Sequence, residues 1–303
     1  MGDFCSEENR RHSTLLVPFS YYKCLIPDYF AAVPIHWHGE FEINHIISGC
    51  AEFICGDGRF VSAEGDIIII PPNMFHAIYP HENSKQIYDT LVFSPEMLGA
   101  SENDRSAVSC VRPMVSGEFG INPRITREHI YYDEIKTAVE NIFSCAKGNM
   151  PQLDMLMKSE MLRLFWLLEV SGDIFRVSEN TVSMGEIIRP AIEYMNENFN
   201  EDISVGQLAE VVHLSKSYFM RCFKKAAGIG AIEYLAQLRV KKVCALLYET
   251  DKTAAEAASE CGFRNLSNFN RRFKEIMGCT PREYRKTTRE RGDFQAKTQH
   301  GII

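Results

Sequence analysis

The chain has 303 residues, of which 45% are hydrophobic and 24% are charged, and its formal net charge is −7. A chain of this length and composition can bury two cores, which excludes a disordered or fibrous protein. The first residues lack the basic start and apolar run of a signal peptide, and the longest aliphatic run, residues 67–70, is too short to cross a bilayer. We therefore expect a cytoplasmic protein with no membrane partner.

The charge is unevenly distributed along the chain. Residues 186–286 carry 16 Lys and Arg against 13 Asp and Glu, whereas the rest of the chain is strongly acidic. The ten cysteines include no CxxC pair, so the sequence predicts neither a disulfide framework nor a zinc finger. A basic segment joined to an acidic one is typical of a DNA-contacting module attached to a domain with another task.

Residues 1–127 predict an all-β domain. From about residue 15 to residue 125 the sequence is rich in β-branched and aromatic residues, and Gly, Pro or Asn interrupts them every seven or so positions. Short strands joined by tight turns are typical of a sandwich or a small barrel.

Two motifs in this domain resemble those of cupins. Residues 36–49 have the pattern H-x-H-x3-E-x6-G, and residues 65–76 have G-x5-P-x-N-x2-H, with Asn73 where glycine is usual. His36, His38 and Glu42 share the parity of one strand, so their side chains point to one side. A cupin-like barrel would bring His76 to the same place from another strand.

Three interpretations of these four residues are open at this point. Three imidazoles and a carboxylate form a typical set of ligands for a divalent transition metal such as iron, manganese, nickel or zinc. The same groups could line a metal-free pocket for a small-molecule effector, which is the interpretation that we favour here. They could also make structural hydrogen bonds alone.

Residues 128–170 predict a helical hairpin. Apolar residues recur at helical spacing on both sides of the break at residues 148–151. They are Ile135, Val139, Ile142, Phe143, Leu153, Leu156, Met157, Met161, Leu164, Phe165 and Leu168. Periodicity does not show whether this stripe packs within the domain or against a second subunit. The polar residues 171–185 predict a linker, and residues 287–303 a polar tail.

The sequence repeats itself at an offset of 50 residues between positions 203 and 286. The matches in the first copy are far more numerous than chance gives, and self-similarity of this kind indicates two copies of one structural unit. The matching residues are Ser217, Phe219, Arg221, Phe223, Lys224, Gly228, Glu233 and Tyr234, which recur as Ser267, Phe269, Arg271, Phe273, Lys274, Gly278, Glu283 and Tyr284.

Each copy has the layout of a helix-turn-helix unit. A capping box begins one helix, a short turn follows, and a second helix carries two phenylalanines at i and i+4. In the first copy the capping box is Ser204 with Gln207, the turn is residues 213–214, and the phenylalanines are Phe219 and Phe223. In the second copy the capping box is Thr253 with Glu256, the turn is at Gly262, and the phenylalanines are Phe269 and Phe273. Residues 232–249 predict one connecting helix of about 27 Å, close to the roughly 34 Å between successive major-groove faces of DNA.

This half resembles the DNA-binding domain of the AraC/XylS family of bacterial regulators. The resemblance covers residues 187–286 and is most specific in GFRNLSNFNRRFKEIMGCTPREYRK, although residues 254–258 are smaller than is usual. It implies an all-α domain, residues 186–286, in which two recognition helices contact DNA. The implied contact residues are Ser217, Met220, Arg221, Lys224, Leu266, Ser267, Asn268, Asn270, Arg271 and Lys274.

The whole chain therefore predicts an α+β multidomain protein that regulates transcription, as an activator, and is not an enzyme. A sugar or small acid would bind at the cluster His36, His38, Glu42 and His76 and change how protomers or domains are arranged. The expected partners are double-stranded DNA, the effector, RNA polymerase and a second copy of the chain. The alternatives are a metal-dependent cupin enzyme or metal sensor fused to a DNA-binding domain, and a DNA-binding protein whose β-domain serves only for dimerisation.

Overall fold

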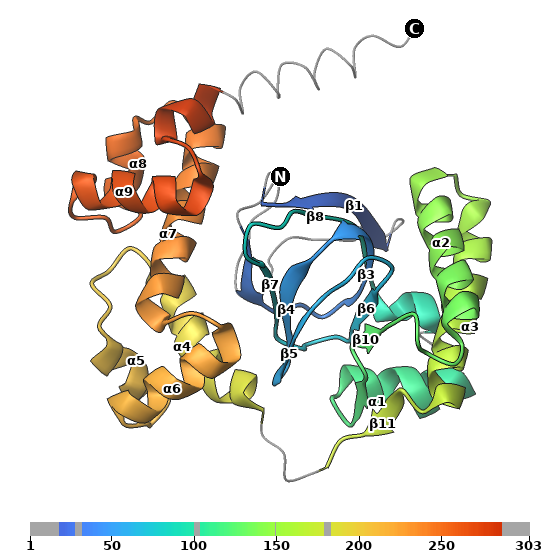
Figure 1. Cartoon of the computed structure of the whole chain (residues 1–303). Coiled ribbons are helices and arrows are strands. Elements are labelled where there is room, and N and C mark those ends of the chain that lie inside the picture. Colours follow the sequence, from blue (N-terminus) through green and yellow to red (C-terminus); the bar gives the residue numbers. More distant parts are fainter. Residues whose placement is uncertain (1–17, 28–31, 100–103, 149, 179–182, 287–303) are drawn as a thin grey trace, which may run out of the picture. The chain divides into compact units, whose positions relative to one another are not determined.

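The computed structural model describes residues 18–27, 32–99, 104–148, 150–178 and 183–286. The chain forms two compact units, one ending at Ser183 and the other beginning at Met184. Figure 1 shows strands in the first unit and helices throughout the second. The α+β multidomain fold predicted from the sequence is confirmed, while the predicted polar tail lies outside the described residues.

Two antiparallel sheets form the β-barrel of the first unit. The five-stranded sheet has the order β1 (Phe19–Ile26), β8 (Gln86–Phe93), β3 (Phe41–Gly49), β6 (Ile67–Ile70) and β10 (Arg124–Ile125). The four-stranded sheet has the order β2 (Val33–His36), β7 (His76–Pro80), β4 (Ala51–Cys55) and β5 (Gly58–Val61). The segment after β8 forms η1 (Pro95–Leu98), η2 (Ala107–Val111), α1 (Arg112–Val115) and β9 (Phe119–Ile121).

The five-stranded sheet is buried on both faces, and strand parity decides which residue lies on which face. In β3, Phe41 and Ile43 belong to the core that includes the helices, while Ile46 belongs to the core inside the barrel. In β6, Ile67 and Ile69 face the helices, whereas Ile68 and Ile70 face the interior. This arrangement explains why the run of four isoleucines shows no polar alternation.

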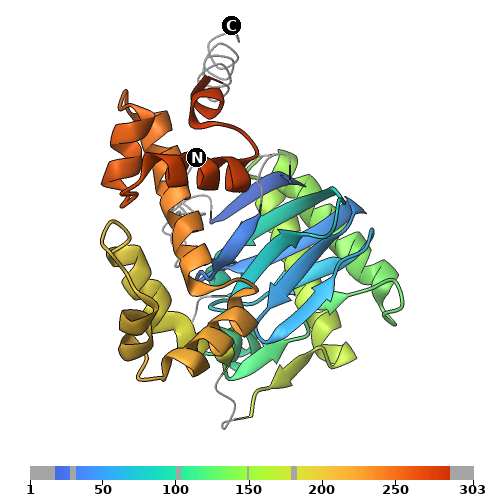
Figure 2. The same ribbon diagram turned by 60° about the vertical axis from the view of Figure 1, so that its left-hand side comes forward.

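The helical hairpin covers the outer face of this sheet (Figure 2). Helix α2 (Tyr132–Gly148) and helix α3 (Leu153–Ser171) bury most of the predicted apolar stripe in a core shared with the strands. Phe165 makes an edge contact with Phe41, with ring centroids 5.0 Å apart. The stripe therefore packs within the domain, except for Leu156, which is 48% exposed.

The predicted linker, residues 171–185, is partly ordered structure. Ser171 ends α3, and Gly172 adopts the left-handed conformation that commonly ends a helix. Strand β11 (Ile174–Arg176) then pairs with β9, and helix α4 already begins at Met184. A three-residue strand has too few positions for the sequence to show a period, so the sequence did not indicate β11 within the predicted linker.

The second unit consists of the helices α4 (Met184–Glu197), α5 (Val205–Val211), α6 (Lys216–Ala227), α7 (Ala231–Glu249), α8 (Ala254–Glu260) and α9 (Leu266–Met277). Both predicted capping boxes form, at the starts of α5 and α8. Among the described helices, none is long and apolar enough to cross a membrane. The cysteines within the described ranges are free thiols.

Candidate functional site

The structure brings the four cupin-motif residues together inside the barrel. His36 ends β2 and lies opposite His76 of β7 in register, Glu42 is in β3, and His38 lies in the segment between β2 and β3. Both sheets therefore contribute to this cluster, which we call the His/Glu cluster. Each of the four residues is at most 8% exposed.

The potential ligand atoms of the His/Glu cluster all lie within 4.8 Å of one another. The Glu42 Oε2 atom is 3.2 Å from His38 Nε2 and 3.6 Å from His76 Nε2. Burial by itself raises the pKa of Glu42, but hydrogen bonds with His38 and His76, together with their charges, outweigh it and hold the pKa well below its ordinary value. The carboxylate is therefore ionised inside the barrel.

Backbone carbonyl groups fix the orientation of all three imidazole rings. In each ring, Nδ1 lies within hydrogen-bonding distance of a carbonyl oxygen, and because a carbonyl oxygen only accepts, Nδ1 donates. The other ring nitrogen, Nε2, faces the Glu42 carboxylate in both His38 and His76. The pairs are His36 with Pro34 at 2.9 Å, His38 with Glu40 at 3.2 Å, and His76 with Met74 at 2.9 Å.

A chain of hydrogen bonds also holds Glu42 in place. Asn44 Nδ2 donates to Glu42 Oε1 at 2.7 Å, and Thr90 Oγ1 donates to Asn44 Oδ1 at 2.6 Å. The Cys24 sulfur lies 3.8 Å from the same Thr90 oxygen, and burial raises the pKa of this thiol to about 11. The thiol therefore stays neutral, and the carboxylate is the anionic group of this network.

Asn73 and Trp37 lie beside the cluster. Asn73 has a φ of 64°, a left-handed conformation that asparagine tolerates better than most residues, so it can replace the usual glycine of the motif. Its backbone N–H donates to the His38 carbonyl at 2.7 Å. Trp37 is 3% exposed and packs on Phe75, which assigns it to the core.

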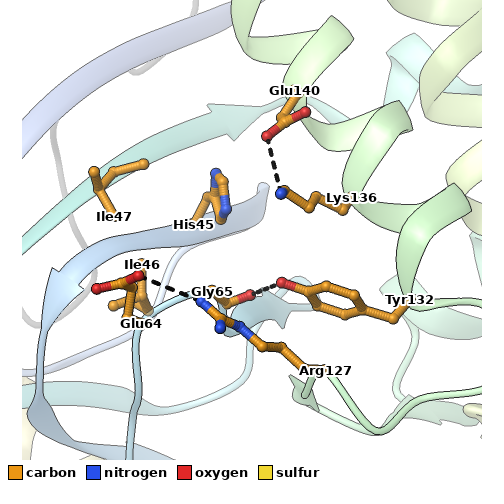
Figure 3. Close-up of a pocket in the computed structure, with 9 residues that line it drawn as sticks. All are labelled: His45, Ile46, Ile47, Glu64, Gly65, Arg127, Tyr132, Lys136 and Glu140. Carbon is orange, nitrogen blue, oxygen red and sulfur yellow. Dashed lines mark hydrogen bonds and ion pairs between the residues drawn. The ribbon is translucent and has the colours of Figure 1, made fainter.

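A pocket of about 480 Å³ lies between strand β3, the turn before β6 and helix α2 (Figure 3). Tyr132 Oη donates to the Gly65 carbonyl at 2.7 Å, and Lys136 approaches Glu140 at 3.7 Å. His45 lines this pocket because its odd parity places it on the opposite face of β3 from Glu42. No motif in the sequence indicated this pocket, because its lining combines residues 45–47, 64–65 and 127–140.

In the second unit, all ten residues implied to contact DNA are exposed. Four lie on α6 and six on α9, the second helices of the two helix-turn-helix units. They are Ser217, Met220, Arg221, Lys224, Leu266, Ser267, Asn268, Asn270, Arg271 and Lys274. Each helix therefore buries its phenylalanine face and leaves the predicted contact face open.

The sequence repeat reappears as a repeat in packing. Phe219 and Phe223 have ring centroids 5.6 Å apart, and Phe269 and Phe273 have the same separation. A tyrosine then packs on the second phenylalanine of each pair. The ring centroids are 5.7 Å apart in the first helix-turn-helix unit and 5.8 Å apart in the second helix-turn-helix unit. The matching residues thus build two copies of one small core.

Tyr218 lies beside Arg221 on the exposed side of α6 and was not among the residues named from the sequence. It is 40% exposed, and the Arg221 guanidinium lies over its ring at 5.6 Å. The offset of 50 places Tyr218 opposite Asn268 in the repeat, so the repeat itself carried the signal. Arg271 is held in a comparable exposed position by Asn268 and Glu275 of its own helix.

The loop between α4 and α5 contacts both helix α7 and the second helix-turn-helix unit. Arg239 of α7 donates to the carbonyl oxygens of Phe199, at 2.7 Å, and Glu201. Gly262 of the second helix-turn-helix unit lies very close to the same loop. A Cβ atom at this position would lie 2.8 Å from the Asn200 carbonyl oxygen. Its φ of +82° also favours glycine. This junction links α7, the loop and the second unit.

Two family models match the chain in the order in which its domains occur. A model of the AraC-like ligand binding domain matches residues 28–165, and a model of a helix-turn-helix domain matches residues 208–287. A ligand-binding β-domain followed by helix-turn-helix units defines a DNA-binding transcription regulator. The chain belongs to the AraC/XylS family of these regulators.

Two relatives match this chain over nearly the whole length of both proteins. The chain is 24% identical over 294 residues to the uncharacterized HTH-type transcriptional regulator YdeC of Bacillus subtilis, covering 94% of this chain and 99% of that protein. It is 24% identical over 300 residues to the melibiose operon regulatory protein of Escherichia coli K12, covering 95% and 96%. Both relatives are described as regulatory proteins.

Similar solved structures include the DNA-binding domain of AdpA in complex with a target DNA. It is 28% identical, covers 34% of this chain and 94% of that chain, and has a TM-score of 0.33. ToxT from Vibrio cholerae with a bound unsaturated fatty acid is 12% identical, covers 88% and 94%, and has a TM-score of 0.45.

The close approach at Gly262 gives a stability prediction with a matched control. Gly262→Ala should lower the free energy of unfolding of the helical compact unit, which begins at Met184, by several kcal/mol. The substitution adds a backbone clash to the strain of a positive φ. Gly278→Ala has the same strain, with a φ of +70°, but nothing lies within 4 Å of its new Cβ atom, so its cost should be about 1–2 kcal/mol. Calorimetric unfolding of both full-length variants measures the difference, and equal losses would contradict the role of the junction.

Proposed function

We propose that the protein is a transcription activator that binds specific DNA sequences in the cytoplasm and responds to a sugar or small acid bound at the His/Glu cluster. One observation carries this proposal: the chain combines a buried polar cluster in its ligand-binding domain with two exposed helix faces in its DNA-binding domain. Binding of the effector would change how protomers or domains are arranged and hence which DNA sites are occupied. RNA polymerase is the partner through which such a regulator activates transcription.

On DNA, α6 and α9 would each enter a major groove. Arg221 and Arg271 are placed to read bases, because arginine can make two hydrogen bonds with guanine. Lys224 and Lys274 lie one helical turn further along each helix and would contact phosphates, which position the protein without reading sequence. Helix α7 between the two units would set the spacing of the two contacts at about one turn of DNA.

The base-reading roles give a direct test on duplexes selected by the full-length protein from random DNA. Arg221→Ala and Arg271→Ala should each weaken binding by about 1–3 kcal/mol and relax the preference at one base position. Lys224→Ala and Lys274→Ala serve as matched controls that should weaken binding to all duplexes evenly. Fluorescence anisotropy with single-base variants of the selected duplex measures both effects, and an even loss in the arginine variants would refute base reading.

A homodimer formed through the helical hairpin would supply two such DNA-binding units. Helix α3 buries one face in the domain core but exposes a second apolar face to solvent. Met155, Leu162, Trp166 and Val170 recur along it at helical spacing and are 81%, 45%, 57% and 49% exposed. A self-complementary apolar face is typical of two-fold dimers, so we propose a second copy of this chain as its occupant.

The proposed dimer makes a prediction about oligomeric state. Leu162→Glu should convert the full-length protein from dimer to monomer at micromolar concentration, because a carboxylate would be buried without a partner at the interface. Val61→Glu places the same charge on an exposed residue of β5 and should leave the dimer intact. Light scattering measures both, and a wild-type protein that is already monomeric would rule out this interface.

A further inference from the structure

We propose that the pocket between β3, the turn before β6 and α2 binds a small zwitterion, a molecule that carries both a carboxylate and an ammonium group as an amino acid does. The pocket lies on the opposite face of β3 from the His/Glu cluster, so the proposal does not depend on what the cluster binds. A ligand in this pocket would contact both the barrel and the helical hairpin.

The charged side chains of the pocket form two pairs of opposite sign. Arg127 Nη2 lies 3.4 Å from Glu64 Oε1. Lys136 Nζ lies 3.7 Å from Glu140 Oε1. The formal charges of these four side chains cancel, so the pocket offers separate positive and negative groups without a net charge. A ligand with charges of one sign would be repelled by two of these side chains, whereas a zwitterion finds a partner for each of its charges.

Both ion pairs can exchange their present partners for a ligand at little cost. A charge-assisted hydrogen bond between nitrogen and oxygen is about 2.7–2.9 Å long, and both pairs are longer. Their side chains are between 42% and 64% exposed, and exposed ion pairs contribute little to stability. The Arg127 guanidinium can therefore donate two hydrogen bonds to a ligand carboxylate, and Glu140 can accept one from a ligand ammonium group.

His45 gives the pocket a buried polar group between the two ion pairs. Its side chain points from β3 into the pocket (Figure 3) and is 8% exposed. Burial lowers the pKa of the imidazole, although the carboxylates of Glu140 and Asp89 act against it, so the ring is neutral and offers one donor and one acceptor. Within the described ranges the ring makes no hydrogen bond, so it is available to a ligand that has groups of both kinds.

Gly65 allows two residues of the pocket wall to lie close to the turn before β6. A Cβ atom at this position would lie 2.6 Å from Arg127 Nε and 2.9 Å from Tyr132 Oη. Tyr132 donates to the Gly65 carbonyl at 2.7 Å, so the start of α2 is held against the turn. The resulting volume of about 480 Å³ is within the range of roughly 300–1,000 Å³ that is typical of small-molecule sites.

The test measures the binding of each genetically encoded L-amino acid to the full-length protein by isothermal titration calorimetry. At least one should bind with a millimolar or lower dissociation constant. The amine that lacks its carboxylate and the acid that lacks its ammonium group should each bind about tenfold more weakly or worse.

Variants locate the ligand. Arg127→Gln and Glu140→Gln each remove one charge from the pocket and should weaken binding about tenfold or more. Arg59→Gln is the matched control, because Arg59 forms an ion pair of the same 3.4 Å length with Glu52 outside the pocket lining. Circular dichroism checks the folding of each variant, and Lys136→Gln takes the place of a pocket variant that unfolds.

Three results would overturn the proposal. The first is that no amino acid binds, and the second is that the acid or the amine alone binds as tightly as the amino acid. The third is that the pocket variants bind like wild-type protein or lose no more affinity than the Arg59 variant. The double variant His38→Gln, His76→Gln should bind the amino acid with wild-type affinity, and a loss in this variant alone would assign the ligand to the His/Glu cluster instead.

Discussion

The alternation of side chains along β3 is the constraint on which the ligand-binding domain depends. Phe41 and Ile43 point outward into the core shared with the helical hairpin, while Glu42 and Asn44 point inward to the His/Glu cluster. A register shift of one residue would exchange the two faces and bury the carboxylate against the hairpin. The hairpin therefore fixes the strand that positions the only carboxylate of the cluster, and any change at the cluster acts on a strand whose other face supports α2 and α3.

The DNA-binding domain uses a different principle, in which one small core is built twice. The phenylalanine pairs occupy the buried face of α6 and α9 and leave the opposite face of each helix free for bases and phosphates. Arg239 and the close approach at Gly262 tie the intervening loop to α7 and to the second unit. Two units whose mutual position is fixed can lose less conformational entropy on binding DNA than two independent ones.

Much of this could be predicted from the sequence, because the decisive signals were local or repeated. The capping boxes and the phenylalanines at i and i+4 specify their own helices. The cupin motifs indicated that His36, His38 and Glu42 lie together, but these residues come from β2, the segment after it and β3, and not from one strand as the parity argument assumed. Strand β11 was missed because its pairing with β9 is a long-range contact with no periodic signal. The role of the hairpin stripe also required the structure, since periodicity shows that a face is buried but not what buries it.

The measurement that tests the central claim most directly is the dissociation constant of the full-length protein for a selected duplex, with and without each member of a panel of sugars and small carboxylic acids. The account predicts that at least one compound changes the dissociation constant of the wild-type protein. It also predicts that the double variant His38→Gln, His76→Gln binds the same duplex but no longer responds to that compound. A response of equal size in the variant would contradict a sensing site at the His/Glu cluster.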